Sequence, residues 1–154
     1  MEWKLVDYFM INKGSGGSMS NADYSAKQKL LFNFLVGEYG YKLLEDYRGA
    51  CTFVTTYIKN DIRISMDFDI KDNFFYFKLI KGRDTLFPND SDRKNIIPFF
   101  RLFEKYDPYF DPNSIQPDDH QYEEALRLNA ELLKKYGDKV LKGEEWIKSK
   151  YPNK

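Results

Sequence analysis

Apolar and polar residues alternate without a break from residue 62 to residue 69. Ile62, Ile64, Met66 and Phe68 share one parity, and charged or hydroxyl-bearing residues fill the positions between them. Successive side chains of a strand point to opposite faces of a sheet, so this period predicts one buried and one solvated face. Such strands are typical of antiparallel sheets.

Neighbouring segments are also predicted to be extended. Residues 50–58 are rich in Thr, Val, Phe and Tyr, which favour pleated structure, and residues 41–45 carry a shorter apolar pattern. Residues 74–81 are apolar on both faces, so this strand either is covered on both sides or offers one face to a partner. The polar runs 59–61 and 71–73 predict turns. The pattern indicates a meander of about four strands.

Apolar residues at helical spacing predict helices on either side of this meander. Residues 25–38 are expected to form a helix that is capped by Ser25 and stopped by Gly40. Residues 92–106 are expected to form another, with Pro98 marking its start or a kink.

The C-terminal third is predicted to be an irregular connection followed by helices. Residues 107–119 contain three prolines and read as the connection. A long helix follows, with Asp118 or Asp119 as its cap and Gly137 as its stop, and a shorter helix continues over residues 138–147. Helices segregated from a strand meander predict an α+β fold with an antiparallel sheet packed by helices.

A Gly- and Ser-rich run divides the chain unequally. Residues 14–18 have the composition of a flexible laboratory linker, and Ser20-Asn21-Ala22 resembles the remnant that a cleaved expression tag leaves before a target. The sequence therefore predicts an engineered fusion with a peptide segment at 1–13, a linker and tag remnant at 14–22, and a single domain at 23–154.

The segment before the linker is apolar and β-prone. Its apolar residues include Trp3, Leu5, Tyr8, Phe9 and Ile11. Three interpretations stay open: a tethered ligand from a partner, the domain's own C-terminal strand moved to the front by circular permutation, or an unrelated handle. The first two both predict that the segment joins a sheet edge as a further strand.

Composition narrows the possible partners. Lys+Arg and Asp+Glu are both 24, so the formal net charge is zero, which argues against nucleic acid as the main partner. No apolar run is long enough to cross a membrane, and the single cysteine excludes a disulfide within one chain. Abundant Lys, Asn, Ile and Tyr suggest a bacterial source, and we expect a cytoplasmic protein.

Side chains with catalytic or metal-binding chemistry are few. Asp67, Asp69 and Asp72 offer oxygen ligands for a hard cation, but a solvated sheet face explains them as well. His120 is the only histidine and is taken as the first turn of a helix. Cys51 is expected to be a buried small apolar residue. No catalytic residue, metal or cofactor is predicted.

Aromatic residues make up 18% of the chain, which exceeds what one small core needs. The surplus is expected to line a surface for a protein or peptide partner, because such surfaces favour aromatic side chains. The candidate partner-binding residues are Phe74, Tyr76, Lys78, Tyr109 and Phe110.

Two stretches resemble a known class of protein. Residues 129–147, NAELLKKYGDKVLKGEEWI, and residues 37–41, GEYGY, which lead into the strand meander, are together similar to small bacterial immunity proteins of polymorphic toxin systems. The resemblance implies a non-enzymatic protein that neutralises a cognate toxin by binding it, with no catalytic residues to carry over.

Two other functions remain as alternatives. A small hydrolase or nuclease-like domain would use His120 with Asp67 or Asp69 as an acid–base pair. A structural domain that exchanges strands between copies would form oligomers.

Overall fold

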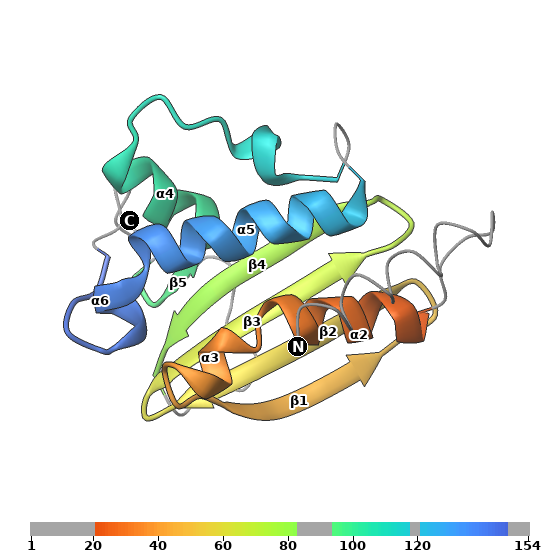
Figure 1. The fold of residues 1–154 in the computed structure, drawn as a ribbon, viewed down its shortest axis with the longest axis horizontal. Helices are drawn as coiled ribbons and strands as arrows, with labels where there is room; N and C mark the ends of the chain where they lie inside the picture. The colour runs from red at the N-terminus through yellow and green to blue at the C-terminus, as the bar shows by residue number, and fades with distance from the viewer. Residues whose placement is uncertain (1–20, 83–93, 118–120, 148–154) are drawn as a thin grey trace.

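The computed structural model describes residues 21–82, 94–117 and 121–147. Its centre is an antiparallel sheet whose strands lie side by side in chain order (Figure 1). The strands are β1 (Lys42–Arg48), β2 (Thr52–Lys59), β3 (Ile62–Asp69), β4 (Phe74–Lys81) and β5 (Ile96–Pro98). The predicted α+β fold with an antiparallel meander is therefore confirmed, with one strand more than the predicted number.

The turns within the meander depend on asparagines with left-handed backbones. Asn60 has φ of 54° between β2 and β3, and Asn73 has φ of 51° between β3 and β4. Asparagine tolerates this conformation better than most residues, so both hairpins close tightly. The pairing is in register from Lys59 opposite Ile62 outward along β2 and β3.

Helices lie over one face of the sheet, as Figure 1 shows for α2, α3 and α5. They comprise α2 (Asn21–Leu31), α3 (Phe34–Gly37), α4 (Phe99–Tyr106), the 3-10 turn η1 (Pro112–Ile115), α5 (Tyr122–Tyr136) and α6 (Asp138–Leu141). The core between helices and sheet is aromatic. Phe68 packs against Phe53 and Phe75 with ring centroids 5.6 and 5.2 Å apart. Edge-to-face rings of this kind add to the stabilisation from burial.

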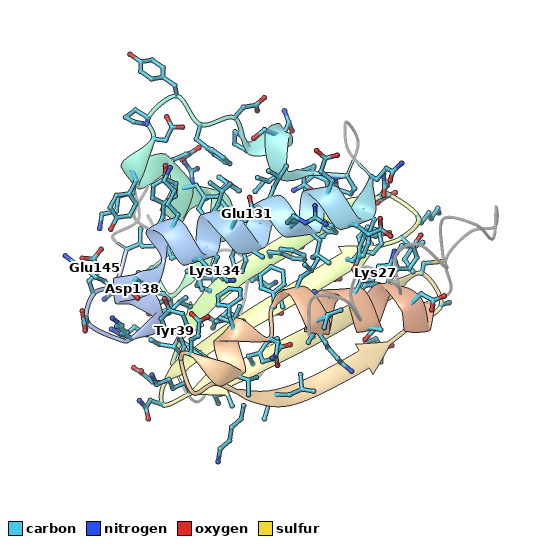
Figure 2. All side chains as sticks on the ribbon, in the orientation of Figure 1. Lys27, Tyr39, Glu131, Lys134, Asp138 and Glu145 are labelled. Atoms are coloured by element: carbon cyan, nitrogen blue, oxygen red, sulfur yellow. The ribbon has the colours of Figure 1, made fainter. Side chains whose placement is uncertain are left out.

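Polar contacts join the N-terminal helices to the C-terminal ones. The Tyr122 hydroxyl donates to the carbonyl of Tyr24 at 2.9 Å, and the Tyr41 hydroxyl donates to the carbonyl of Leu141 at 2.9 Å. The fully buried Lys27 of α2, labelled in Figure 2, forms an ion pair with Glu123 of α5. Burial lowers the pKa of this lysine. The two helical segments are therefore fixed to each other as well as to the sheet.

The predicted helix at 25–38 is wrong at its start and in its middle. It begins at Asn21, so Ser25 lies inside α2 and is fully buried there instead of capping it. A break at residues 32–33 separates α2 from α3. The predicted stop is confirmed: Gly40 has φ of 76°, and Tyr41 donates its N–H to the carbonyl of Leu35 at 2.9 Å.

The predicted helix at 92–106 is a strand followed by a helix. Ile96 and Ile97 belong to β5, because the outer edge of β4 pairs with them through Ile80 and Leu79. Edge pairing outweighs the helical spacing of these apolar residues. The helix starts at Phe99, directly after Pro98. Pro98 therefore marks a helix start, which was one of the two roles predicted for it, and not a kink.

Two smaller predictions about the C-terminal helices also need correction. The N-cap of α5 is Gln121, without a side-chain bond, and the predicted caps Asp118 and Asp119 lie outside the described residues. The last helix ends at Leu141, so residues 145–147 lie beyond it without regular secondary structure.

Cys51 is exposed, contrary to the prediction. Strand β2 starts only at Thr52, and the N–H of Gly49 donates to the carbonyl of Thr52 at 2.7 Å. Cys51 therefore lies in the β1–β2 connection, where it is not covered by the core.

No helix in the described ranges is long and apolar enough to cross a membrane. The segment 1–13 and the linker lie outside the described residues, so the predicted additional strand at the N-terminus stays a prediction.

Candidate functional site

A large groove follows the outer side of β4. It has a volume of about 1430 Å³ and is bordered by β4, β5, α4, η1 and the chain after α6, with Asp67 and Asp69 of β3 and Asn129 of α5 also in its lining. Its lining is mainly aromatic and aliphatic, with charged side chains at the rim. The aromatic lining residues are Phe74, Phe75, Tyr76, Phe77, Phe99, Phe100 and Trp146.

The strand edge within this groove is only partly paired. β5 covers β4 at Lys78, Leu79 and Ile80, and the N–H of Lys81 donates to the carbonyl of Asn95 at 2.8 Å. The backbone N–H and carbonyl groups of successive strand residues point to alternate sides. Because Lys81 faces β5, Phe75 and Phe77 also direct their N–H and carbonyl groups toward this edge. The β5 pairing ends before it reaches either of them.

The side chain of Gln116 occupies the edge at Phe75. Its Oε1 accepts the N–H of Phe75 at 2.8 Å, and its Nε2 donates to the carbonyl of Phe75 at 3.1 Å. One primary amide therefore satisfies the same two backbone groups that a residue of a neighbouring strand would satisfy. Gln116 is itself buried, so these bonds are shielded from water.

Local contacts of η1 and α5 place Gln116. Asp111 caps η1 by accepting the N–H of Asn113 at 3.0 Å. Asn129 of α5 donates from Nδ2 to the carbonyls of Ile115 and Ala125, both at 2.9 Å. The η1 turn is thus held from both sides directly before Gln116.

Asn129 also presents an unpartnered acceptor. The residue is 1% exposed and lines the groove, and its Oδ1 has no hydrogen-bond partner among the described residues. Exchanging the oxygen and nitrogen positions would aim the oxygen at the carbonyls of Ile115 and Ala125, so the amide orientation is fixed. A buried acceptor of this kind favours a ligand that brings an N–H or O–H donor.

Charged residues lie at the opposite end of the groove. The Nζ of Lys105 lies 2.5 Å from Oε1 of Glu145, which also accepts the Tyr106 hydroxyl at 3.1 Å. The bond from Lys105 lowers the pKa of Glu145, and the same bond raises the pKa of Lys105. The indole of Trp146 donates to the carbonyl of Lys94 at 3.0 Å, which secures this end against β5.

A second polar cluster lies away from the groove, near α6. The Tyr39 hydroxyl donates to Oδ1 of Asp138 at 2.8 Å, and Lys142 pairs with Oδ2 at 3.0 Å (Figure 2). Burial, with help from this bond, raises the pKa of Tyr39 to about 12, and the bond lowers the pKa of Asp138. These bonds tie the connection after α3 to α6.

Of the predicted partner-binding residues, the structure brings three together. Phe74, Tyr76 and Lys78 alternate with the core residues of β4, project from its helix-free face and line the groove. The rings of Phe74 and Tyr76 are 4.7 Å apart, and Tyr76 is 49% exposed. Tyr109, at 95% exposure, and Phe110, which packs 5.4 Å from Phe103, do not line this groove.

Sequence reasoning missed Gln116 and Asn129. Asn129 carried a usable signal, because it lies on the buried stripe of α5 with Ala125, Leu126 and Leu133. A polar residue at such a position needs partners. Gln116 carried none, because its partner Phe75 is 41 positions away in the sequence.

The candidate carboxylates are held in local structure. Asp67 accepts the Thr52 hydroxyl at 2.7 Å, and Asp69 accepts the N–H of Asp72 at 3.0 Å within the β3–β4 turn. Within the described ranges, no group of three or more His, Cys, Asp or Glu could hold a metal ion. His120 lies outside the described residues, so its predicted alternative role as a base stays a prediction.

No protein-family profile matches this sequence. Comparisons with curated proteins and with solved structures also find no significant match.

Proposed function

We propose that this chain is a non-enzymatic binding protein that receives an extended peptide in the groove beside β4. The observation that supports the proposal most strongly is the groove itself, with its aromatic lining and a strand edge that β5 pairs only in part. At about 1430 Å³ the groove exceeds the usual volume of a small-molecule site. A segment of several residues fits that volume better than a metabolite.

The groove combines the features that peptide sites use. Phe74 and Tyr76 form an apolar platform on one side of β4, and Phe77 and Phe99 lie on the other, 5.5 Å apart. Lys78 and Arg101 add charge at the rim. Aromatic anchors with a polar rim are typical of protein interfaces, where they supply most of the binding energy.

Backbone pairing in this groove requires Gln116 to move. A peptide strand that adds to β4 satisfies the N–H and carbonyl of Phe75 directly, and it replaces the bonds now made by the Gln116 amide. The exchange retains two hydrogen bonds at Phe75, so its cost is confined to finding new partners for the amide. A peptide strand can therefore take the place of the Gln116 amide at the edge of β4.

The segment 2–12 is the first candidate occupant. Its apolar, β-prone residues suit the aromatic lining, and Trp3 and Tyr8 carry donors that the Oδ1 of Asn129 requires. We propose that it represents a ligand peptide tethered through the linker, which raises its effective concentration at the site.

The biological class that we propose is an immunity protein that neutralises a bacterial toxin by binding it. The resemblance of residues 129–147 and 37–41 supports this class, and those residues build the end of α5, α6 and the approach to β1. Co-expression with the protein encoded beside its gene tests the class. Rescue of growth by the intact chain, and its loss on Tyr76→Lys substitution, is the expected result.

The binding proposal itself is tested by cutting the linker. A protease site in place of residues 14–18 allows the folded chain to be cleaved, and labelled free peptide 2–12 is then added. The expected result is exchange of the labelled peptide with the cleaved segment while the domain stays folded.

Each other outcome contradicts the proposal. If the domain unfolds or aggregates after cleavage and dilution, the segment is a relocated native strand. If the domain neither retains the cleaved segment nor binds the labelled peptide, the segment is an unrelated handle. Tyr76→Lys should weaken retention about tenfold or more. Tyr109→Lys is the matched control, since this residue has 95% exposure and does not line the groove.

A further inference from the structure

Asn129 lies next to the part of the β4 edge with which a peptide strand would pair. Its Nδ2 donates to the carbonyl of Ile115, and the following residue, Gln116, holds the N–H and carbonyl of Phe75 through its side chain. Asn129 and Phe75 both line the groove. The Oδ1 of Asn129 is buried and has no hydrogen-bond partner among the described residues. A ligand at this edge therefore meets an unused acceptor.

The groove wall on this side of β4 is apolar. Phe75 and Phe77 stack with ring centroids 4.5 Å apart, and Phe99 lies 5.5 Å from Phe77. A charged donor such as an ammonium group needs several acceptors or a counter-charge when it is buried, and the amide of Asn129 offers one oxygen. An aromatic side chain with one N–H or O–H matches both features, because its ring suits the walls and its donor suits the oxygen.

The geometry of a sheet decides which residue of an added strand reaches this acceptor. Residues directly opposite each other on neighbouring strands point their side chains to the same face. The side chain of Phe75 points to the helix-covered face, where its ring lies 5.6 Å from that of Tyr122 of α5. Asn129 belongs to the buried stripe of the same helix. The residue opposite Phe75 therefore directs its side chain toward α5 and Asn129.

The segment 2–12 has one suitable side chain on its more apolar face. Alternate positions of an extended strand share a face. The odd-numbered residues of the segment are Trp3, Leu5, Asp7, Phe9 and Ile11. The even-numbered residues include two charges, Glu2 and Lys4, so the apolar helix-covered side of the groove suits the odd-numbered set. Within that set, Trp3 is the side chain that carries a neutral hydrogen-bond donor.

Charge selects the direction of the added strand in this register. An antiparallel strand places Glu2 opposite Tyr76 and diagonal to Lys78, whereas a parallel strand places Lys4 at that position. Opposite charges at the diagonal favour the antiparallel direction, and like charges disfavour the parallel one. An antiparallel strand also satisfies both backbone groups of Phe75 from a single residue.

We propose that Asn129 selects a tryptophan in the bound peptide, with the indole N–H of Trp3 donated to its Oδ1 and the segment antiparallel to β4. The inference rests on the peptide site proposed above and identifies the residue that determines which side chain that site accepts. Asn129 keeps its bonds to the carbonyls of Ile115 and Ala125, so only the side chain of Gln116 has to leave the edge.

Exchanging one group of the ligand tests the donor. In the linker-cleaved protein, the affinity for peptide 2–12 is compared with that for an analogue that carries benzothienylalanine at position 3, where sulfur replaces the indole N–H. The analogue keeps the shape of the ring and should bind about fivefold or more weakly, because Oδ1 stays buried without a donor. Tyr8→Phe removes the other aromatic donor, which points to the opposite face in this register, and should change the affinity less than about twofold.

Each contrary result identifies which step has failed. Equal affinities for the peptide and its position-3 analogue overturn the role of Asn129 and leave the peptide site in place. A loss of affinity in Tyr8→Phe, with none in the analogue, overturns it as well, because the segment then turns its other face to α5. Absence of binding by peptide 2–12 in every form overturns the peptide site and this inference with it.

Charge exchange tests the direction of the strand. The Glu2→Lys peptide should bind about two- to fivefold more weakly, and Lys78→Glu in the protein should restore its affinity. Circular dichroism confirms that the Lys78 variant folds. Tighter binding of a Lys4→Glu peptide to the unaltered protein, without any loss for Glu2→Lys, would indicate a parallel strand and overturn the antiparallel register.

Discussion

The two edges of this sheet differ in how their backbone groups are treated. At the β4 edge, β5 pairs with Lys78, Leu79 and Ile80, and the Gln116 amide satisfies Phe75, so the edge lies inside a groove. At the β1 edge, only the side of the strand that faces β2 is paired within the described residues. A groove closed by a side chain can discriminate among ligands by shape, whereas the β1 edge has no such closure among the described residues and is interrupted by an irregularity between Leu43 and Glu45.

The comparison also separates the energetic roles of the two edges. Contacts at the β4 edge are buried and hold η1 and α5 in place, so substitutions there should change the stability of the fold. Leu43, Leu44 and Tyr47 of β1 are exposed, so substitutions at these three positions should leave the free energy of unfolding nearly constant. The following predictions test this division, from the largest expected effect to the smallest.

Asn129→Asp should be the most damaging change. It replaces the Nδ2 donor with a carboxylate oxygen facing the carbonyls of Ile115 and Ala125, and it buries a charge. We expect a loss of about 3 kcal/mol or more in the free energy of unfolding, measured with urea. Asn113→Asp makes the same chemical change at an exposed position and should cost little. Equal losses for both variants would contradict the account of the groove.

Gln116→Ala should destabilise the domain and strengthen peptide binding. The substitution leaves the N–H and carbonyl of Phe75 without their present partners, which costs about 1–3 kcal/mol of unfolding free energy. A peptide strand that supplies both partners regains that energy, so the affinity for peptide 2–12 should rise. Gln121→Ala, at an exposed position, is the control. Weaker peptide binding in the Gln116 variant would exclude backbone pairing at Phe75.

Tyr47→Lys and Tyr76→Lys should separate the two surfaces. Both residues are about half exposed, at 54% and 49%, so each substitution should alter the unfolding free energy by only about 0.5 kcal/mol. Tyr47→Lys should leave the affinity for peptide 2–12 unchanged, and Tyr76→Lys should lower it, because only Tyr76 lines the groove. An equal loss of peptide affinity in both variants would contradict the assignment of the peptide site to the β4 groove.

Acid should produce the smallest effect. The pKa values of Glu145 and Asp138 are lowered in the folded chain by bonds from Lys105 and Tyr39 respectively. Their contribution to stability is therefore present above the unfolded pKa of about 4 and is lost as the pH falls through the lower folded pKa. Thermal unfolding between neutral and acidic pH should show this loss, and Asp138→Asn with Glu145→Gln should flatten the profile. An unchanged profile in the double variant would assign the acid sensitivity to other carboxylates.

Much of the sheet could be predicted because its information is local. Alternation over residues 62–69 and the apolar run 74–81 define β3 and β4 within their observed bounds. Residues 96–97 were predicted as helix, but two adjacent isoleucines are compatible with a helix or with a strand. Only the edge of β4, supplied by residues far away in sequence, decides between them.

The candidate site was harder to predict than the fold. Tyr76 and Lys78 could be selected because a strand that is apolar on both faces implies a second covered or binding surface. Gln116 could not, because its role depends on η1 being carried back to β4 by α5. The β1 edge was similarly hidden, since its strand was predicted to end at 45 and continues to Arg48.

Hydrogen exchange measured by mass spectrometry on the linker-cleaved protein tests the central claim most directly. Adding peptide 2–12 should slow amide exchange over residues 74–78 and 112–116, while exchange over residues 42–48 stays unchanged at constant protein concentration. Slowing confined to residues 42–48, or no slowing in either region, would contradict the assignment of the peptide site to the β4 groove.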